Sequence, residues 1–219
     1  MTAPSRSHRI FTVMFGRKPT PKQFWAWFVS NEAMLYDFEK DMERIFKKLA
    51  AELNRVDPNL TFEFGPQKTD GREFVVSAGG IKSSFPAVVS LVSAAPKLER
   101  WKITAFRPRR YPINRIQIET CSVDPEKVEF TLLDNGKTAG IHLFIPGLQQ
   151  NVTAWKQIGY LLLDEALGEY DVETKLGIIK LFAPEAEIPG ERIPLAELPD
   201  VFDRHVLTLA GRSSGPSIH

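Results

Sequence analysis

The chain has 219 residues, and its 28 lysines and arginines nearly balance its 27 aspartates and glutamates. Hydrophobic residues make up 43% and charged residues 25%, a globular composition that excludes a wholly disordered chain. The single cysteine excludes a fold built on intrachain disulfides, and the sequence contains no apolar run of transmembrane length. We therefore expect a cytoplasmic α+β protein, and the near-zero net charge argues against a protein dominated by polyanion binding.

The near-neutral total hides an uneven distribution of charge. Residues 1–22 contain five basic residues and no acid, and residues 97–115 contain seven basic residues against one acid. Residues 160–203 contain eleven acidic residues against three basic ones. The last two segments either neutralise each other inside the fold or form separate charged faces.

Residues 1–19 are expected to be a basic, poorly ordered leader. The apolar run Ile10–Phe15 is too short for the hydrophobic region of a secretory signal. Met14 is an alternative start, which would make residues 1–13 an upstream extension.

The helical patterns come next. Thr20 and Gln23 form the pattern of a capping box, which opens a short helix rich in aromatic residues. Apolar residues at alternating steps of three and four then predict a long helix over about 31–55. Further helices are expected at Phe85 to Ala95, at about 151–167 and, more briefly, at Leu195 to Phe202.

Alternating apolar residues predict about seven strands. They begin near Leu60, Phe74, Trp101, Ile116, Val128, Ile141 and Leu176. Asn135-Gly136 is a strong hairpin signal between two of them. The order strand-strand-helix-strand occurs at about 60–106 and again at about 127–182. This repeated ββαβ unit reflects either a duplication or a common α+β arrangement.

The fold expected from these patterns is α+β, with a mostly antiparallel sheet of about seven strands and two main helices packed on it. Residues 20–210 are expected to form a single domain, and residues 211–219 a disordered tail. One continuous sheet is favoured over two intimate subdomains, because residues 107–114 are short and rich in proline and arginine.

Acidic residues near the end of the 151–167 helix are one candidate site. Glu165, Glu169 and Asp171 could serve as an acid/base pair or hold a divalent cation. The simpler interpretation is a solvated helix end, and the helical phase predicts that Asp164 points to solvent.

Arg107, Arg109, Arg110 and Tyr111 are the second candidate site. Arginine forks beside an aromatic ring suit a carboxylate or phosphate partner, whereas three arginines are few for nucleic acid. The simpler alternative is that these arginines pair with the acidic residues of 160–203 inside the fold.

Other chemistry-bearing patterns are weak. Gly79-Gly80 could let backbone N–H groups bind an anion, although Ser83-Ser84 more simply cap the following helix. Gly211 to Gly215 spells a nucleophile-elbow motif without the strand, helix and later partners that the motif needs. Cys121 is expected to be a structural thiol and His142 a solvent-side residue. The scattered histidines indicate no metal site, and no cofactor is expected.

Four motifs carry a resemblance. They are Phe24-Trp25-x-Trp27-Phe28-x-x-Asn31-Glu32, Leu60-Thr61-Phe62-Glu63-Phe64-Gly65, Ala94-Ala95-Pro96-x-Leu98-x-x-Trp101 and Leu167-Gly168-Glu169-Tyr170-Asp171. Over about residues 14–203 the chain resembles a family of uncharacterised bacterial proteins catalogued as a domain of unknown function. Members open with a short basic leader, which favours Met14 as the start. The resemblance implies no activity, cofactor or catalytic residue.

The sequence favours a non-enzymatic cytoplasmic binding or regulatory domain that uses the Arg107–Tyr111 loop or an exposed apolar patch. The expected partner is a protein or a small anionic ligand, not nucleic acid or a membrane. The alternative is a small hydrolase or transferase that uses Glu165, Glu169 or Asp171. The patterns do not distinguish oligomeric states.

Overall fold

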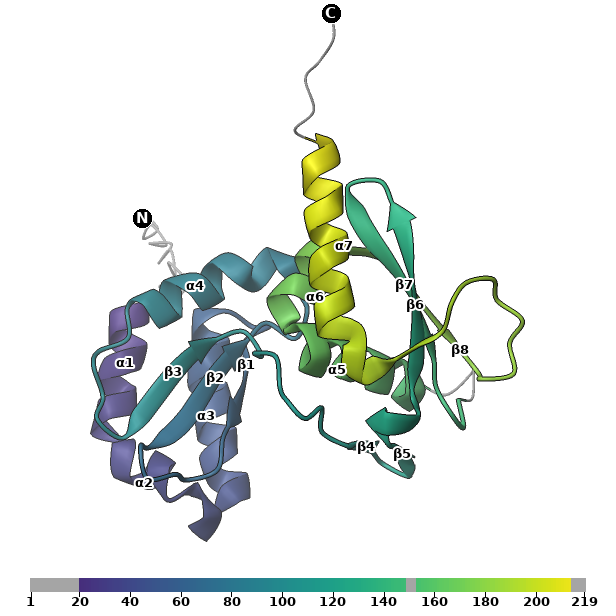
Figure 1. Cartoon of the computed structure of the whole chain (residues 1–219). Helices are drawn as coiled ribbons and strands as arrows, with labels where there is room; N and C mark the ends of the chain where they lie inside the picture. The colour runs from purple at the N-terminus through teal and green to yellow at the C-terminus, as the bar shows by residue number, and fades with distance from the viewer. Residues whose placement is uncertain (1–19, 149–152, 214–219) are drawn as a thin grey trace, which may run out of the picture.

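Two groups of helices and strands form two lobes joined by a single connecting segment (Figure 1). The computed structural model describes residues 20–148 and 153–213. The predicted leader therefore lies outside the described residues, as does the tail beyond residue 213. No helix within the described ranges is long and apolar enough to cross a membrane.

The N-terminal lobe is a three-stranded sheet with helices on one face. Its elements are α1 (Pro21–Ser30), α2 (Glu32–Tyr36), α3 (Met42–Val56), β1 (Thr61–Phe64), β2 (Arg72–Ser77), α4 (Phe85–Ser93) and β3 (Trp101–Ala105). The predicted capping box opens α1, since the Gln23 N–H donates to Thr20 Oγ1 and the Thr20 N–H donates to Gln23 Oε1. Residues of α1, α3 and α4 bury the aromatic face of β2, where Phe28 stacks on Phe74 at 5.1 Å.

The predicted helix over 31–55 is not continuous. It breaks into α2, a 3-10 turn at Phe38–Lys40, and α3. Asp37 and Asp41 stand at the breaks with non-helical backbone angles, as expected of a residue whose side chain competes with helical hydrogen bonding. The turn buries Phe38 against Phe46 and Phe64, so aromatic packing offsets the lost helical turn.

The C-terminal lobe contains a four-stranded sheet and a separate β-hairpin. Its elements are β4 (Ile116–Ile118), β5 (Cys121–Val123), β6 (Glu129–Asn135), β7 (Thr138–Phe144), α5 (Thr153–Leu167), α6 (Glu169–Lys175), β8 (Leu176–Phe182), β9 (Ile193–Pro194) and α7 (Leu198–Ser213). The Asn135-Gly136 hairpin between β6 and β7 is confirmed. The predicted last helix is longer than expected, because α7 runs to Ser213 and so includes the start of the predicted tail.

The α+β class is confirmed, but the single, mostly antiparallel sheet is wrong. There are three small sheets, ordered β1-β2-β3, β4-β5 and β8-β7-β6-β9. Two of them are mixed, because the crossovers through α4 and α5 bring β3 and β8 back parallel to β2 and β7. The predicted ββαβ unit therefore occurs in both lobes with the same pairing: an antiparallel pair followed by a parallel third strand.

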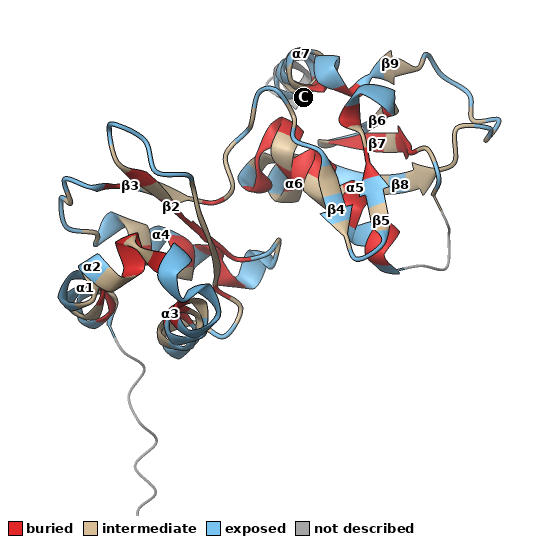
Figure 2. Cartoon of the chain, turned by 90° about the horizontal axis from the view of Figure 1, so that it is seen from below, coloured by how far each residue is buried: buried red, intermediate tan, exposed pale blue. Residues whose placement is uncertain are grey.

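Each lobe has its own hydrophobic core (Figure 2). The N-terminal core is built largely from aromatic residues such as Phe28, Phe74 and Trp101, and the C-terminal core from aliphatic residues such as Ile141 and Leu162. Because most apolar burial occurs within each lobe, the junction between the lobes is rich in polar contacts.

Candidate functional site

The linker, residues 107–114, crosses the polar face of the N-terminal sheet. Successive strand residues face opposite sides, so Glu63 of β1 and Glu73 of β2 lie away from the aromatic core. Arg107 forms an ion pair with Glu63, and Arg110 Nη1 lies 2.9 Å from Glu73 Oε2. Two linker arginines are thus bound to carboxylates of the N-terminal lobe.

Arg109 binds the C-terminal lobe. Its guanidinium donates to both carboxylate oxygens of Asp203 in α7 at 2.8 Å, and to Asp171 in α6 at 2.9 Å. Its Nε donates to the Leu167 carbonyl at the end of α5. The hydrogen bond from Arg109 is the main cause that holds the pKa of Asp203 below its usual value, and these partners raise the pKa of Arg109.

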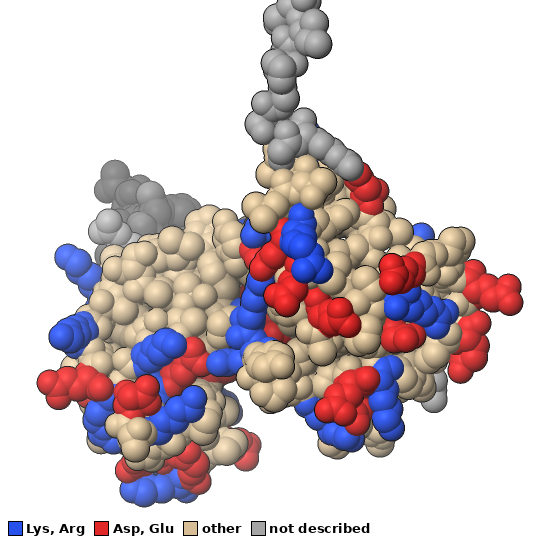
Figure 3. Space-filling view, in the orientation of Figure 1, with Lys and Arg blue, Asp and Glu red and all other residues tan. Residues whose placement is uncertain are grey.

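The linker arginines therefore pair inside the fold, but the simpler sequence-based alternative describes only two of them, because Arg110 pairs with Glu73 outside the segment 160–203. Arg107 also reaches Asp164 at 3.4 Å, so Arg107 and Arg109 both contact the acidic segment 160–203. Figure 3 shows the resulting band of basic residues between the lobes, with acidic residues on both sides. The fourth predicted residue, Tyr111, differs from its neighbours because 91% of it is exposed.

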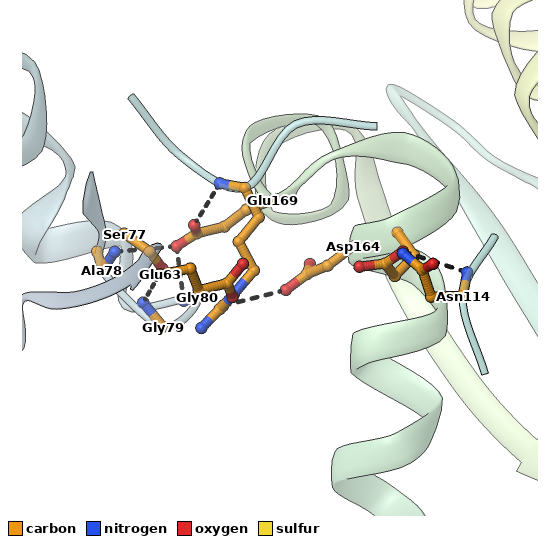
Figure 4. A network of polar contacts seen from close by, with 10 residues as sticks. Glu63, Ser77, Ala78, Gly79, Gly80, Asn114, Asp164 and Glu169 are labelled. Carbon is orange, nitrogen blue, oxygen red and sulfur yellow. Dashed lines mark hydrogen bonds and ion pairs between the residues drawn. The ribbon is translucent and has the colours of Figure 1, made fainter. Parts of the chain in front are cut away.

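Glu169, the first residue of α6, is fully buried between the lobes. Its Oε1 accepts hydrogen bonds from the backbone N–H groups of Ala78 at 3.1 Å and Gly80 at 3.0 Å (Figure 4). Its Oε2 accepts from the Arg107 N–H at 3.1 Å, and its own N–H donates to the Arg107 carbonyl. We call the three N–H groups of Ala78, Gly80 and Arg107 the carboxylate nest.

The nest lies at the Gly79-Gly80 turn where the sequence indicated an anion site. Gly79 and Gly80 have φ values of +56° and +78°, which glycine adopts most readily. The group bound there is the protein's own Glu169 carboxylate. Ser84 stands at the N-cap of α4 but makes no capping hydrogen bond, because its hydroxyl donates to Asp57 instead.

Asp164 is also buried, with 8% of its surface exposed. The prediction that it points to solvent is wrong, since the end of α5 lies against the linker as well as against its own core. Burial raises the pKa of Asp164 to about 7; Arg107 opposes this rise, and Glu169 and Glu173 add to it. Burial likewise raises the pKa of Glu173.

The three predicted acids are not brought together. Glu169 lies in the nest, whereas Glu165 accepts hydrogen bonds from the backbone N–H and side-chain amide of Asn114. Asp171 is bound by Arg109 and by Lys175 at 2.8 Å. Within residues 20–148 and 153–213, no cluster of three or more histidine, cysteine or acidic side chains could hold a metal.

A groove of about 580 Å³ lies beside the linker, where both lobes contribute residues. The N-terminal lobe supplies Lys68, Glu73 and Lys102, the linker supplies Arg110, Tyr111 and Asn114, and the C-terminal lobe supplies Glu165. The carboxylates of Glu73 and Glu165 already have donors in Arg110 and Asn114. Lys68 and Lys102 form no ion pair with any residue that the structure describes.

Sequence reasoning missed Glu63 and Glu73 as partners of the linker. Charged residues within otherwise apolar strands were the available signal for the two glutamates. That signal marks a polar sheet face without saying what covers it.

Comparison with known proteins adds no family or fold relative: no family model, curated protein or solved structure matches this chain. The resemblance carried by the four motifs therefore stays a prediction.

Proposed function

We propose that this protein is a non-enzymatic cytoplasmic binding or regulatory domain that holds its ligand in the groove between the lobes. The observation that carries the proposal is Tyr111, an almost fully exposed aromatic residue beside a groove large enough for a small ligand. The neighbouring arginines are bound to both lobes, so the chain that carries Tyr111 is anchored on each side.

Two exposed lysines give the groove a place for an anionic ligand. Lys68 and Lys102 are without an ion pair among the described residues. Of the groove acids, Glu63 and Glu73 are paired with arginines, whereas Asp70 and Glu165 have no ion pair there and Glu165 accepts from the Asn114 amide. A ligand that carries a carboxylate or phosphate could bind the two ammonium groups. A planar group on the same ligand could stack on Tyr111.

The alternative of a small hydrolase or transferase is less favoured. Its predicted carboxylates, Glu165, Glu169 and Asp171, are each bound by a different partner and converge on no common point. The geometry supports a role for these side chains in joining segments of the chain.

The binding proposal is tested with nucleoside monophosphates and aromatic carboxylates, each beside its neutral parent compound, by thermal shift and calorimetry. We expect an anionic member to bind the wild type, and Tyr111→Ala or Lys102→Ala to weaken Kd about tenfold, roughly 1.4 kcal/mol. Leu207→Ala and Lys180→Ala change exposed residues of the C-terminal lobe and serve as matched controls. Binding that survives both groove variants, or no binding by any anion, would contradict the proposal.

A further inference from the structure

We propose that Glu169 is an intramolecular latch: its carboxylate, carried by the C-terminal lobe, occupies the carboxylate nest and holds the two lobes in their docked orientation. The nest is thus a binding site, and the ligand class that it takes is a carboxylate. The latch itself is independent of the proposed function. Its consequence for ligand binding, given below, rests on that function.

The nest is built for an anion. Three backbone N–H groups point at one carboxylate, two from the turn that follows β2 and one from the linker. Hydrogen bonds to an ionised acceptor are stronger than those between neutral groups. Ala78 and Glu169 are fully buried, so removing the carboxylate would leave buried donors without an acceptor.

The local sequence shapes the Ala78–Gly80 part of the nest. β2 runs into Ser77, whose hydroxyl accepts a hydrogen bond from the Gly79 N–H at 2.9 Å. The positive φ values of Gly79 and Gly80 make a tight turn in which the Gly80 N–H donates to Glu169 Oε1, while the Gly79 N–H donates to Ser77 Oγ. A Cβ atom added at Gly80 would come within 2.9 Å of Glu173 Oε1, so that side chain would have to move, and the φ of +78° is a conformation that favours glycine.

Like charges near Glu169 work against the latch. Asp164, Glu169 and Glu173 lie along the α5–α6 segment and repel one another at the junction. The cations that act on them there are Arg107, which also pairs with Glu63, and Lys82. Apolar contact at the junction includes Tyr170, which packs on Phe85 and Phe106 while half exposed. The two hydrophobic cores are separate, so the orientation of the lobes depends on these polar contacts together with the packing of Tyr170.

The groove depends on that orientation, since Lys102 comes from one lobe and Glu165 from the other. If the groove binds a ligand as proposed, releasing the latch changes the spacing of its walls and weakens that binding.

The latch is tested on the full chain by the distance between two spin labels. Cys121→Ser removes the native thiol, and Ala51→Cys in α3 with Leu207→Cys in α7 places one exposed label on each lobe. We expect one narrow distance distribution for this protein and a broadened or shifted one after Glu169→Ala. Added acetate should restore the narrow distribution, whereas acetamide, a neutral molecule of similar shape, should not.

Glu173→Ala is the matched control, because it removes a neighbouring carboxylate of α6 that lies outside the nest; its distribution should stay narrow. An unchanged distribution after Glu169→Ala, or equal rescue by acetate and acetamide, overturns the latch. If Glu169→Ala does not fold, Glu169→Gln decides: the amide presents only one acceptor oxygen, so a distribution as narrow as that of the parent overturns the proposal. These distances are measured without ligand, so they test the latch independently of ligand binding. If the latch holds but the groove binds no anion, only the proposed function is refuted.

Discussion

Replacing Asp164 with asparagine should stabilise the protein at neutral and alkaline pH but not in acid. In the folded protein burial raises the pKa of this carboxyl from its ordinary 3.8 to about 7. Between pH 3.8 and about 7 the carboxyl is therefore protonated in the folded state but ionised in the unfolded state. The free energy of unfolding accordingly falls as the pH rises through this range. Above pH 7 both states are ionised and the cost is constant.

The shift of about 3 pKa units corresponds to an upper limit of roughly 4 kcal/mol, since one unit is about 1.4 kcal/mol. The pKa of about 7 already includes the attraction of Arg107 for the ionised carboxylate. We expect a net gain of about 2 kcal/mol in the free energy of unfolding at pH 8, because the asparagine amide brings two N–H donors that need acceptors in this buried position. Near pH 4 the variant and the wild type should differ little, because the wild-type carboxyl is then protonated when folded.

The measurement is urea unfolding at half-unit steps from pH 4.5 to 8, followed by tryptophan fluorescence. The variant is compared with the wild type and with Glu187→Gln, which removes an exposed carboxylate from the loop after β8. A difference between Asp164→Asn and wild type that is the same at pH 4.5 and pH 8 would refute the reasoning. It would show that burial of the ionised carboxyl carries no proton-linked cost.

Three further substitutions test the junction and the cores. Arg109→Lys should lower the free energy of unfolding by about 1 kcal/mol, because lysine cannot reproduce the paired contacts with Asp203. Asp203→Asn should therefore destabilise the wild type more than it destabilises the Arg109→Lys variant, and equal effects in a double-mutant cycle would contradict this. Gly80→Ala should lower the free energy of unfolding, measured in urea, by about 2 kcal/mol, which is more than Gly136→Ala lowers it. Both glycines have positive φ, but only Gly80 has a neighbour within 4 Å of the new Cβ, so equal losses would contradict this prediction. Phe74→Ala should cost about 3–5 kcal/mol and remove the near-ultraviolet circular dichroism of the aromatic lobe, and an unchanged spectrum would argue against the stacked packing.

Local structure was largely predictable because its causes lie within a few residues. The capping box at Thr20, the hairpin at Asn135-Gly136 and the end of α5 before Gly168 each follow from a short-range hydrogen bond or a special backbone angle. All seven predicted strands occur, since alternation of apolar residues records one buried face. The short α6 was missed, because its polar residues lack a clear helical apolar pattern.

The candidate site was only partly predictable. The basic linker and the acidic segment were evident from composition, whereas Gly79-Gly80 was only a weak signal of an anion site. The helical phase of Asp164 was misleading, because it assumes that a helix buries one face against one core. The end of α5 also contacts the linker, so a second face is covered.

The sequence by itself determined most of the helices and strands, the two ββαβ units and the opposite charges of the linker and the C-terminal third. Only the tertiary structure decided that the strands form separate sheets in two lobes, and that Glu169 rather than an external anion lies in the nest. The physical reason is that the partners are distant in the chain: Glu169 is 91 residues from Ala78, and Arg109 is 94 from Asp203. Hydrogen bonds and ion pairs require atomic contact, and contact at such separations depends on how the two lobes pack.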